Sequence, residues 1–248
     1  MTRLFLVFFL FSTILFSKTI TVAVAANVSY AIAKIIKEFN KQYPNIKVRV
    51  ILGGSGKLTA QIKHNAPYDI FMSANMKYPQ ALYKDSIALT KPVIYAQGSL
   101  AYFSNKPRDF SLKMKLLEEK NIKRIAIANP KTAPYGKATV EALKNAHIYN
   151  DIKNKFIYGE SISQTVMYAK TAADIGFIAK SALYSPKMSM YKENINYIDV
   201  DTKLYTPINQ GIVILKNSNN SDEVKAFYNF ILNNKTKNIL KDFGYLIP

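Results

Sequence analysis

Gly-Gly-Ser-Gly-Lys-Leu-Thr-Ala-Gln-Ile, at residues 53–62, is the stretch that decides the fold. Residues 46–52 before it alternate apolar and polar side chains, which predicts a strand with one buried face. Apolar residues one helical turn apart follow the glycines, and Pro67 closes the segment, so a short helix is expected. A strand that enters a helix through such small residues leaves main-chain N–H groups unpaired at the positive end of the helix dipole. Together with the Ser55 hydroxyl, these donors predict an oxyanion pocket.

Two other interpretations of the same stretch have to be weighed. The Gly56-Lys57 pair suggests a nucleotide-binding P-loop, but that motif needs a glycine where this chain has Ile51. A purely structural turn is the second alternative, because glycine-rich connections between a strand and a helix are common. The oxyanion hypothesis is strengthened by the recurrence of the same construction elsewhere in the chain.

Composition favours a folded, exported protein of two modest domains. The chain has 248 residues, of which 49% are hydrophobic and 12% aromatic, enough to form proper cores. It contains no cysteine, which excludes a lipoprotein anchor, a disulfide framework, thiolate metal sites and cysteine nucleophiles. Met-Thr-Arg followed by an uncharged apolar run to Phe16 is shorter than the ~20 residues that span a bilayer. We therefore expect a cleavable signal peptide at residues 1–17 and a periplasmic mature protein, with a retained N-terminal anchor as the alternative.

The formal net charge of +18 would usually indicate nucleic acid or anionic lipid as a partner. The lysines are scattered along the whole chain, without a block of like charges or an arginine-rich tract. A lysine-rich solvated surface is the preferred interpretation, and no nucleic-acid partner is expected. A nucleic-acid or membrane-surface protein, the alternative, would show binding that depends steeply on salt.

The order of predicted elements indicates two α/β units. Strands at 19–25, 46–52 and 69–72 alternate with helices in a β-α-β-α-β rhythm, which favours a parallel sheet with helices on its faces. After residue 91, two strands, a polar helical stretch ending near Lys123 and further strand–helix pairs form a second unit. Strands at 195–200 and 211–215 could return the chain to the first unit. A capping box formed by Asn220 and Glu223 is expected to open the helix that follows.

We accordingly predict a discontinuous lobe I at residues 18–96 and 206–248, and lobe II at 97–205. Four turns between a strand and a helix stand out, two in each lobe, at residues 26–29, 53–56, 133–136 and 159–162. The carboxyl ends of parallel strands face the ligand crevice of an open sheet. If the lobes face each other across a cleft, four helix N-termini converge on one small volume.

The ordered set of motifs resembles the periplasmic molybdate-binding proteins that feed ATP-driven importers. The resemblance covers nearly all of the predicted mature chain. It rests on Thr-Val-Ala-Val-Ala-Ala-Asn (21–27), Gly-Ser-Gly-Lys-Leu with Gln-Ile (54–58, 61–62), Ala-Pro-Tyr-Asp-Ile-Phe-Met-Ser-Ala (66–74), Ala-Asn-Pro with Ala-Pro-Tyr-Gly-Lys-Ala (128–130, 133–138), Gly-Glu-Ser-Ile-Ser-Gln (159–164) and Asp-Ile-Gly-Phe (174–177).

This resemblance implies a type II periplasmic binding protein fold: two α/β lobes, joined by extended hinge strands, that close on tetrahedral molybdate or tungstate in the cleft. It also implies the ligand-binding residues. By position, the first-turn donor falls at Asn27, the second at Ser55, the third at Tyr135 and the fourth at the main-chain N–H of Ile162. As structural alternatives, Asn27 could cap its helix and Tyr135 could be a packing aromatic.

Three further residues are second-tier candidates for the ligand site: Gly54, Ser161 and Ala179. The last marks a departure, because many members of the family have a tyrosine where this chain has Ala179. Tyr135 is expected to supply the phenol instead. The resemblance further implies a permease with its ATPase as partner, no cofactor other than the transported oxyanion, and a monomer.

An enzyme is the competing class of function. The chain has two histidines, no cysteine and no pattern of metal-binding or paired-carboxylate residues, so catalysis is not expected. A Ser-dependent hydrolase that uses Ser55 beside Lys57 is the alternative within that class. Within binding proteins, the alternatives are sulfate, phosphate or an Fe(III) chelate, which the sequence does not separate from molybdate.

Overall fold

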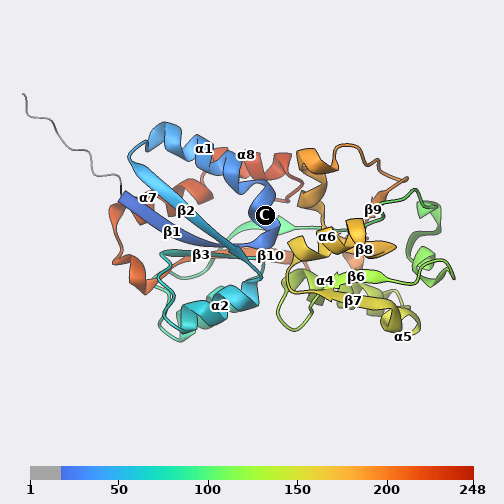
Figure 1. The fold of residues 1–248 in the computed structure, drawn as a ribbon. Helices are drawn as coiled ribbons and strands as arrows, with labels where there is room; N and C mark the ends of the chain where they lie inside the picture. The colour runs from blue at the N-terminus through green and yellow to red at the C-terminus, as the bar shows by residue number, and fades with distance from the viewer. Residues whose placement is uncertain (1–17) are drawn as a thin grey trace, which may run out of the picture.

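The computed structural model describes residues 18–248, and they form two sheets of five strands each, side by side (Figure 1). The predicted signal peptide at residues 1–17 lies outside the described residues. The first sheet has the order β2-β1-β3-β10-β4 and the second the order β7-β6-β8-β5-β9. We call each sheet with its helices the first and the second lobe.

The first lobe is built from both ends of the described chain. Its strands are β1 (Lys18–Ala25), β2 (Ile46–Gly53), β3 (Ile70–Ser73), β4 (Val93–Gly98) and β10 (Ile208–Ile214). Its helices are η1 (Ala26–Tyr30), α1 (Ile32–Gln42), α2 (Ser55–Lys63), α3 (Lys77–Lys84), η7 (Lys216–Ser218), α7 (Asp222–Leu232) and α8 (Asn234–Asp242), where η denotes a 3-10 helix.

The second lobe is one continuous segment of the chain. Its strands are β5 (Leu100–Phe103), β6 (Ile125–Ala128), β7 (Phe156–Gly159), β8 (Ile175–Ala179) and β9 (Tyr197–Asp199). Its helices are η2 (Phe110–Glu118), α4 (Pro134–Asn145), α5 (Tyr149–Ile152), η3 (Lys153–Lys155), α6 (Ile162–Thr171), η4 (Lys180–Tyr184), η5 (Pro186–Met188) and η6 (Thr202–Leu204).

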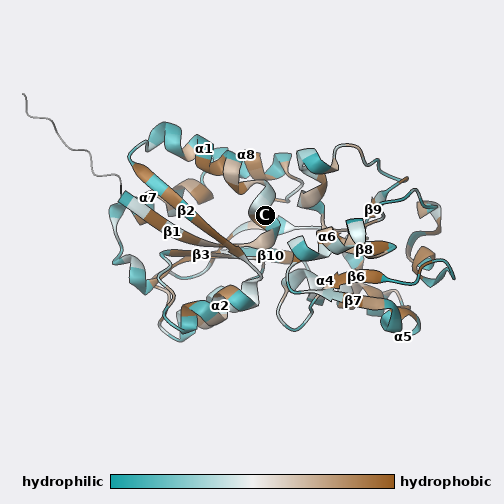
Figure 2. Cartoon of the chain, in the orientation of Figure 1, coloured by the Kyte–Doolittle hydropathy of each residue, from teal (hydrophilic) through white to brown (hydrophobic). Residues whose placement is uncertain are grey.

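Each sheet is covered on both faces because its strands alternate their apolar side chains. Val22 and Val24 of β1 pack into a core with α1 and α7, whereas Ala23 between them joins Leu58 of α2 on the opposite face. Figure 2 shows the same division, with hydrophobic strands inside each lobe and helices that are hydrophilic on their outer sides. The amphipathic spacing in the sequence therefore produces two sandwiched sheets.

The sheets are mixed, whereas the sequence predicted a parallel arrangement. β1 is parallel to β2 and β3, and β6 is parallel to β7 and β8, as expected. However, β10 is antiparallel to β3 and β4, and β5 is antiparallel to β8 and β9. The reason is connectivity: strands that follow a helix run toward the other lobe, whereas β5 and β10 enter from the other lobe and run away from it.

The chain crosses between the sheets twice, once between Gly98 and Leu100 and once between Asp199 and Ile208. The predicted lobe boundaries at 96/97 and 205/206 fall within two residues of these crossings, and the division into lobes at those residues stays a prediction.

Two local predictions were wrong. The polar stretch before Lys123 forms a short 3-10 segment rather than a regular helix, and it is interrupted at Lys113, where φ is 51° and ψ is −132°. The Asp109 carboxylate accepts the Ser111 N–H at 3.0 Å, a local bond that competes with a longer helix. The cap of α7 is Ser221, whose Oγ accepts the Val224 N–H, because Asn220 has a left-handed φ of 54°.

Candidate functional site

The candidate site lies where the two lobes meet, at the carboxyl ends of the parallel strands. In the first lobe, β1 leads into η1 and β2 into α2; in the second, β6 leads into α4 and β7 into α6. These are the four turns singled out in the sequence. Direct contacts between them show that the lobes are in a closed arrangement.

One set of contacts joins α2 and α3 to the loop before α4. The Gly56 N–H donates to the Thr132 carbonyl oxygen at 3.1 Å, and the Tyr78 hydroxyl donates to the same oxygen at 3.1 Å. A Cβ at Gly56 would lie 2.7 Å from that oxygen, so only glycine allows this approach. Thr132 thus holds two donors from the opposite lobe.

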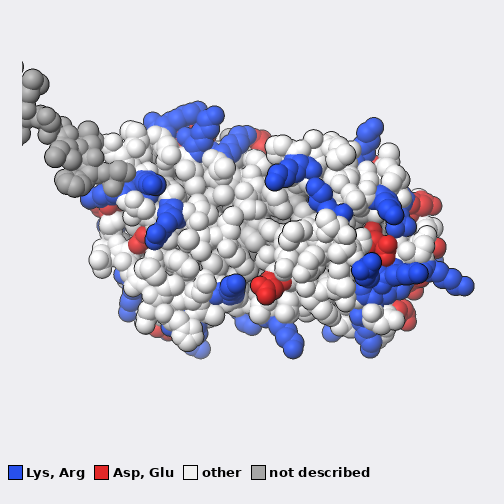
Figure 3. Space-filling view, in the orientation of Figure 1, with Lys and Arg blue, Asp and Glu red and all other residues white. Residues whose placement is uncertain are grey.

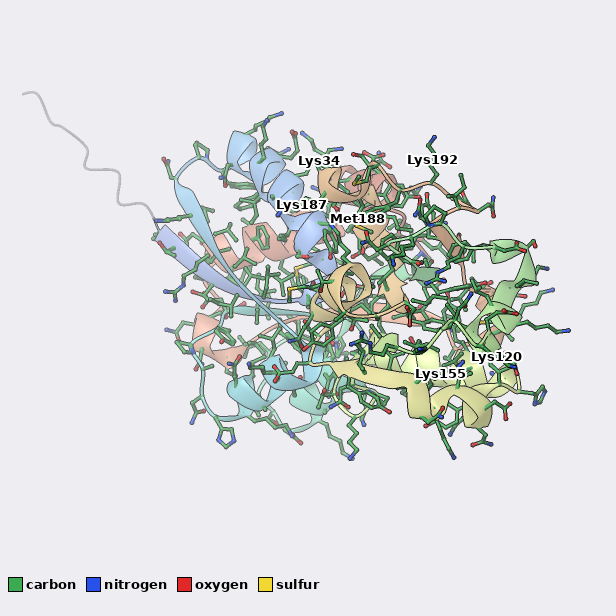
Figure 4. The ribbon with its side chains drawn as sticks, turned by 45° about the vertical axis from the view of Figure 1, so that its right-hand side comes forward. Lys34, Lys120, Lys155, Lys187, Met188 and Lys192 are labelled. Carbon is green, nitrogen blue, oxygen red and sulfur yellow. The ribbon has the colours of Figure 1, made fainter. Side chains whose placement is uncertain are left out.

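A second set joins η1 to α6 and η4. The Ser163 hydroxyl donates to the Ala26 carbonyl oxygen at 2.9 Å, and the Ser181 hydroxyl donates to the Asn27 carbonyl oxygen at 3.0 Å. Met188 of η5, labelled in Figure 4, belongs to a second-lobe core cluster against which Tyr30 of η1 packs. The first turn is therefore held from two sides by the second lobe.

The remaining contact brings two second-tier candidates together. A Cβ on Gly54 would lie 3.0 Å from the Glu160 carbonyl oxygen and 4.0 Å from the Cβ of Ser161. A groove of about 570 Å³ runs along this contact and is lined by residues of α2 and its turn and by residues 160–167. Gly54 and Ser161 line the groove, whereas the four first-tier candidates are buried, with 0–5% of their surface exposed.

Ser55 is the first residue of α2, and its side chain has one hydrogen to offer. Its Oγ accepts the Ala74 N–H at 3.0 Å, which fixes the oxygen between α2 and the end of β3. Within residues 18–248, no acceptor takes the hydroxyl hydrogen. Ser55 is therefore a neutral donor held in place by the main chain, at the positive end of a helix.

Tyr135, in the first turn of α4, is the second hydroxyl donor. Its Oη accepts a hydrogen from Gln210 Nε2 at 3.3 Å, so its own hydrogen remains for another acceptor. Burial raises the pKa of the Tyr135 phenol well above its usual value of 10.0. The phenol consequently keeps its proton, and its ability to donate, throughout the neutral pH range.

Ile162 contributes only its main chain. It is the first residue of α6, so helix geometry leaves its N–H without an intrahelical partner. The preceding Ser161 uses its Oγ to accept the Gln164 N–H at 3.2 Å, which makes it the helix cap. Ser161 therefore stabilises the start of α6, and the Ile162 N–H remains the donor of this turn.

Asn27 uses both hydrogens of its side-chain amide. Its Nδ2 donates to Gln210 Oε1 and to the Tyr245 hydroxyl, both at 2.9 Å. Its Oδ1 is buried and has no hydrogen-bond partner among the residues that the structure describes. In this arrangement the donors that remain in the first turn are main-chain N–H groups.

Ala179, the place of the missing family tyrosine, ends β8 and is completely buried. It offers no side-chain donor, and the segment after it supplies the Ser181 contact to Asn27. Lys and Arg side chains are spread over the outer surface in Figure 3, and the five lysines labelled in Figure 4 all come from outside the four turns. Asp69, the carboxylate of the Pro-Tyr-Asp motif, precedes the start of β3, at the opposite end of the strand from the four turns; it accepts the Thr21 N–H at 2.6 Å and is structural.

Three polar residues of this region carry no signal that the sequence analysis used: Gln210, Tyr245 and Ser181. Gln210 is completely buried in β10, but in the sequence it stands between Asn209 and Gly211, so nothing local marks it as a buried polar residue. Within residues 18–248, His, Asp and Glu nowhere gather in groups of three that could hold a metal, and none of the helices there is suited to spanning a membrane.

Comparisons with known proteins agree with this architecture. The model of a family described as bacterial extracellular solute-binding protein matches residues 20–246. The molybdate-binding protein ModA of Azotobacter vinelandii is 32% identical over 228 residues, covering 91% of this chain and 89% of that protein.

Two solved structures give the same answer for the fold. The periplasmic molybdate-binding protein of Azotobacter vinelandii superposes with a TM-score of 0.85 at 29% identity, over 92% of this chain and 99% of that one. The sulfate-binding protein SubI of Mycobacterium tuberculosis superposes with a TM-score of 0.74 over 92% of this chain and 86% of its own, but at 12% identity it supports the fold alone. With two α/β lobes in the type II periplasmic binding protein fold and a family match over almost all of its described length, this chain belongs to the bacterial extracellular solute-binding proteins.

Proposed function

We propose that this protein binds molybdate, with tungstate as a second ligand, and delivers it to the permease and ATPase of an ABC importer. The observation that carries this function is the meeting of four helix-starting turns from two lobes, with uncharged donors and without lysine or arginine. Relatives that are named molybdate-binding proteins and are aligned over nine-tenths of the chain give independent support.

The proposed donors are the Ser55 hydroxyl, the Tyr135 hydroxyl and the main-chain N–H groups of the first and fourth turns, including Ile162. Hydrogen bonds to a charged acceptor contribute about 1.5–3 kcal/mol each. About five to eight of them can offset much of the hydration that a divalent oxyanion loses on burial. A nanomolar dissociation constant requires a net free energy of about 12 kcal/mol. Neutral donors at helix N-termini are therefore sufficient.

The lobes proposed to close on the anion are residues 18–96 with 206–248, and residues 97–205. We further propose that residues 1–17 direct export to the periplasm and are removed, and that the mature protein acts as a monomer. Binding without turnover is expected, because the donors identified above stabilise an anion and include no pair of acid and base.

Calorimetric titration of the purified protein with molybdate, tungstate, sulfate and phosphate tests the ligand. We expect tight one-to-one binding of the first two only. Sulfate has the same charge and shape as molybdate but is smaller, so it probes whether the donors are spaced for the longer metal–oxygen bonds. Equal responses to all four anions, or none, would rule out the proposed ligand, and a preference for sulfate or phosphate would identify the alternative.

A further inference from the structure

Gln210 lies at the centre of a buried polar network between the lobes. It is completely buried in β10, at the point where the pairing with β4 shifts register between Gln210 and Gly211. The extra residue at this shift is Tyr95 of β4, which has no partner in β10, and such β-bulges are frequent beside functional sites. Gln210 Oε1 accepts the Tyr95 hydroxyl at 2.8 Å and Asn27 Nδ2 at 2.9 Å, whereas its Nε2 donates to Tyr135 Oη at 3.3 Å.

Gly98 makes the space in which this network forms. A Cβ at that position would lie 2.0 Å from Tyr135 Oη and 2.7 Å from Gln210 Nε2. Any other residue at position 98 would push apart Tyr135 Oη and Gln210 Nε2, which are joined by the hydrogen bond. The extra residue at the register shift, Tyr95, and the glycine therefore both belong to β4, and both lie against Gln210.

The hydrogens of the network can be assigned one by one. Tyr95 must donate to Gln210 Oε1, since a carbonyl oxygen only accepts. Gln210 Nε2 must donate to Tyr135 Oη, so the Tyr135 hydrogen stays free. Asn27 gives its amide hydrogens to Gln210 and Tyr245, which leaves its buried Oδ1 unpartnered among the described residues.

Asn27 and Gln210 can reverse their amides only together. If Asn27 alone reversed, its Oδ1 would face Gln210 Oε1, and two acceptors would meet without a hydrogen. If both reversed, Asn27 Nδ2 would become free, but Tyr135 would have to donate its hydrogen to Gln210 Oε1. The network therefore offers either the Tyr135 hydroxyl or the Asn27 amide as a side-chain donor, never both.

We propose that Gln210 is a positioning residue that keeps the Tyr135 hydroxyl hydrogen available to the bound oxyanion and withholds the Asn27 side chain from donation. This role rests on the proposed function, because it concerns donors to the same anion. In the first turn, main-chain N–H groups are then the donors to the oxyanion. The orientation of the Gln210 side-chain amide, which lies outside the four turns, becomes a determinant of affinity.

The substitution Gln210→Glu tests the role, because a glutamic acid side chain imitates glutamine only when it is protonated. An ionised carboxylate accepts the Tyr135 hydrogen and repels the anion, whereas the neutral acid donates to Tyr135 as glutamine does. Burial and the neighbouring dianion disfavour ionisation. We expect Gln210→Glu to weaken molybdate binding at least thirtyfold at pH 8 and to recover most of the affinity at pH 5.5, measured against the unaltered protein at each pH.

The matched control is Gln97→Glu. Gln97 lies on the adjacent strand β4 and donates to Asn209 Oδ1 at 2.9 Å, away from Asn27 and Tyr135. This variant introduces the same charge near the same hinge, and its molybdate affinity should follow that of the unaltered protein at both pH values.

Gln210→Met provides a neutral second variant if the glutamate variant does not fold. Because Gln210 acts through the phenol, Gln210→Met should weaken molybdate binding about tenfold in the unaltered protein. In a Tyr135→Phe background, the factor by which Gln210→Met weakens binding should be at least three times smaller. Equal losses in the two backgrounds, or a loss in Gln210→Glu that is the same at pH 5.5 and pH 8, would assign Gln210 a merely structural role and overturn the inference. Failure of the unaltered protein to bind molybdate would instead overturn the proposed function.

Discussion

Ser55 is a proposed ligand donor whose side chain also makes a structural contact. Its oxygen is fixed by the Ala74 N–H, and this bond leaves its hydrogen as the only part free to act. An aspartate at this position could still accept the Ala74 N–H, and a negative charge is favourable at a helix N-terminus. The same charge would face the bound dianion.

We therefore expect Ser55→Asp to abolish molybdate binding while the unliganded protein keeps its melting temperature within a few degrees. Two unit charges about 4 Å apart interact by about 4 kcal/mol near a protein surface, so a loss of at least a thousandfold is expected. Calorimetry and thermal melting measure the two effects. Ser189→Asp is the control, since the Ser189 hydroxyl is exposed and bonds only to the Pro186 carbonyl oxygen. Retained affinity in Ser55→Asp would remove Ser55 from the site.

At this scale, Ser55, Tyr135 and Ile162 could be proposed from the sequence because each lies in one of the turns whose motifs carry the family resemblance. They could not identify Gln210, whose partner Asn27 is 183 positions away. Contacts of that kind depend on how two lobes dock. No local pattern specifies them, since in the sequence Gln210 stands beside another polar residue, Asn209, and a glycine.

Among the elements, α2 touches the opposite lobe directly at its start, through Gly56. A Cβ at Gly56 would lie 2.7 Å from the Thr132 carbonyl oxygen and 2.9 Å from the Tyr78 hydroxyl. A Cβ at Gly53, three residues earlier, would meet only the flexible side chain of Leu58 at 3.1 Å, within the same lobe.

Gly56→Ala should consequently weaken molybdate binding by tenfold or more, since the two lobes of the closed protein must move apart by several tenths of an ångström to make room for the Cβ. Alanine is about 1 kcal/mol more favourable than glycine inside a helix, so the unliganded variant should be equally stable or slightly more stable. Gly53→Ala is the matched control and should change affinity by less than threefold. Titration and thermal melting of both variants check this, and parallel losses of affinity in both would contradict a specific contact at Gly56.

Helices α1 and α8 are linked by a carboxylate with two lysine partners. Glu38 of α1 lies 2.7 Å from Lys235 Nζ of α8 and 2.6 Å from Lys41 Nζ in its own helix. Hydrogen bonds from Lys235, and then from Lys41, lower the pKa of Glu38 to about 2 from its ordinary value of 4.5. A carboxyl whose pKa is lower in the folded state adds stability above its unfolded pKa and loses it as the pH falls through the folded value.

Glu38→Gln is therefore expected to lower the melting temperature slightly at pH 7, and the difference should disappear between about pH 4.5 and pH 2. Thermal melting across that range measures it. Glu118→Gln, which alters an exposed carboxylate on η2, should leave the curve unchanged. A difference between Glu38→Gln and the unaltered protein that persists at pH 2 would show that the ion pairs are not its source.

Most elements could be predicted from the sequence because apolar periodicity and turn residues agree along most of the chain. The exceptions have local causes. In η2, Asp109 bonds to the main chain and Lys113 breaks the helix. At α7, the left-handed Asn220 moved the cap to Ser221, a shift of one residue that a sequence pattern alone cannot fix.

For the whole molecule, the alternation of strands and helices correctly predicted two α/β lobes but not the direction of the strands that cross between them. The residues of β5 and β10 do not reveal the direction of these strands, and only the path of the chain makes them antiparallel to β8 and β3. The same path explains why residues near both ends of the described chain build one lobe. It also places both crossings beside α4, which carries the proposed donor Tyr135.

Closure itself follows from the electrostatics of the four turns. Each helix N-terminus carries the equivalent of roughly half a positive charge. Several such helix ends repel one another when the cleft holds only water. When a divalent oxyanion is bound, the attraction of each helix end to the anion outweighs this repulsion. The direct bonds to Thr132, Ala26 and Asn27 then add to the closed state. We expect the unliganded protein to be more open, and molybdate to reduce its radius of gyration in small-angle X-ray scattering.

The variant Gly56→Ala tests directly whether the lobes close on molybdate. Its Cβ would clash with the Thr132 carbonyl oxygen only when the lobes are closed, so the unliganded variant should scatter like the unaltered protein. At saturating molybdate, it should contract less than the unaltered protein, whereas Gly53→Ala should contract fully. The expectation would be wrong if calorimetry shows one-to-one binding of molybdate while the radius of gyration of the unaltered protein does not change. In that case the lobes are already closed before the anion binds, and repulsion between helix ends does not hold the cleft open.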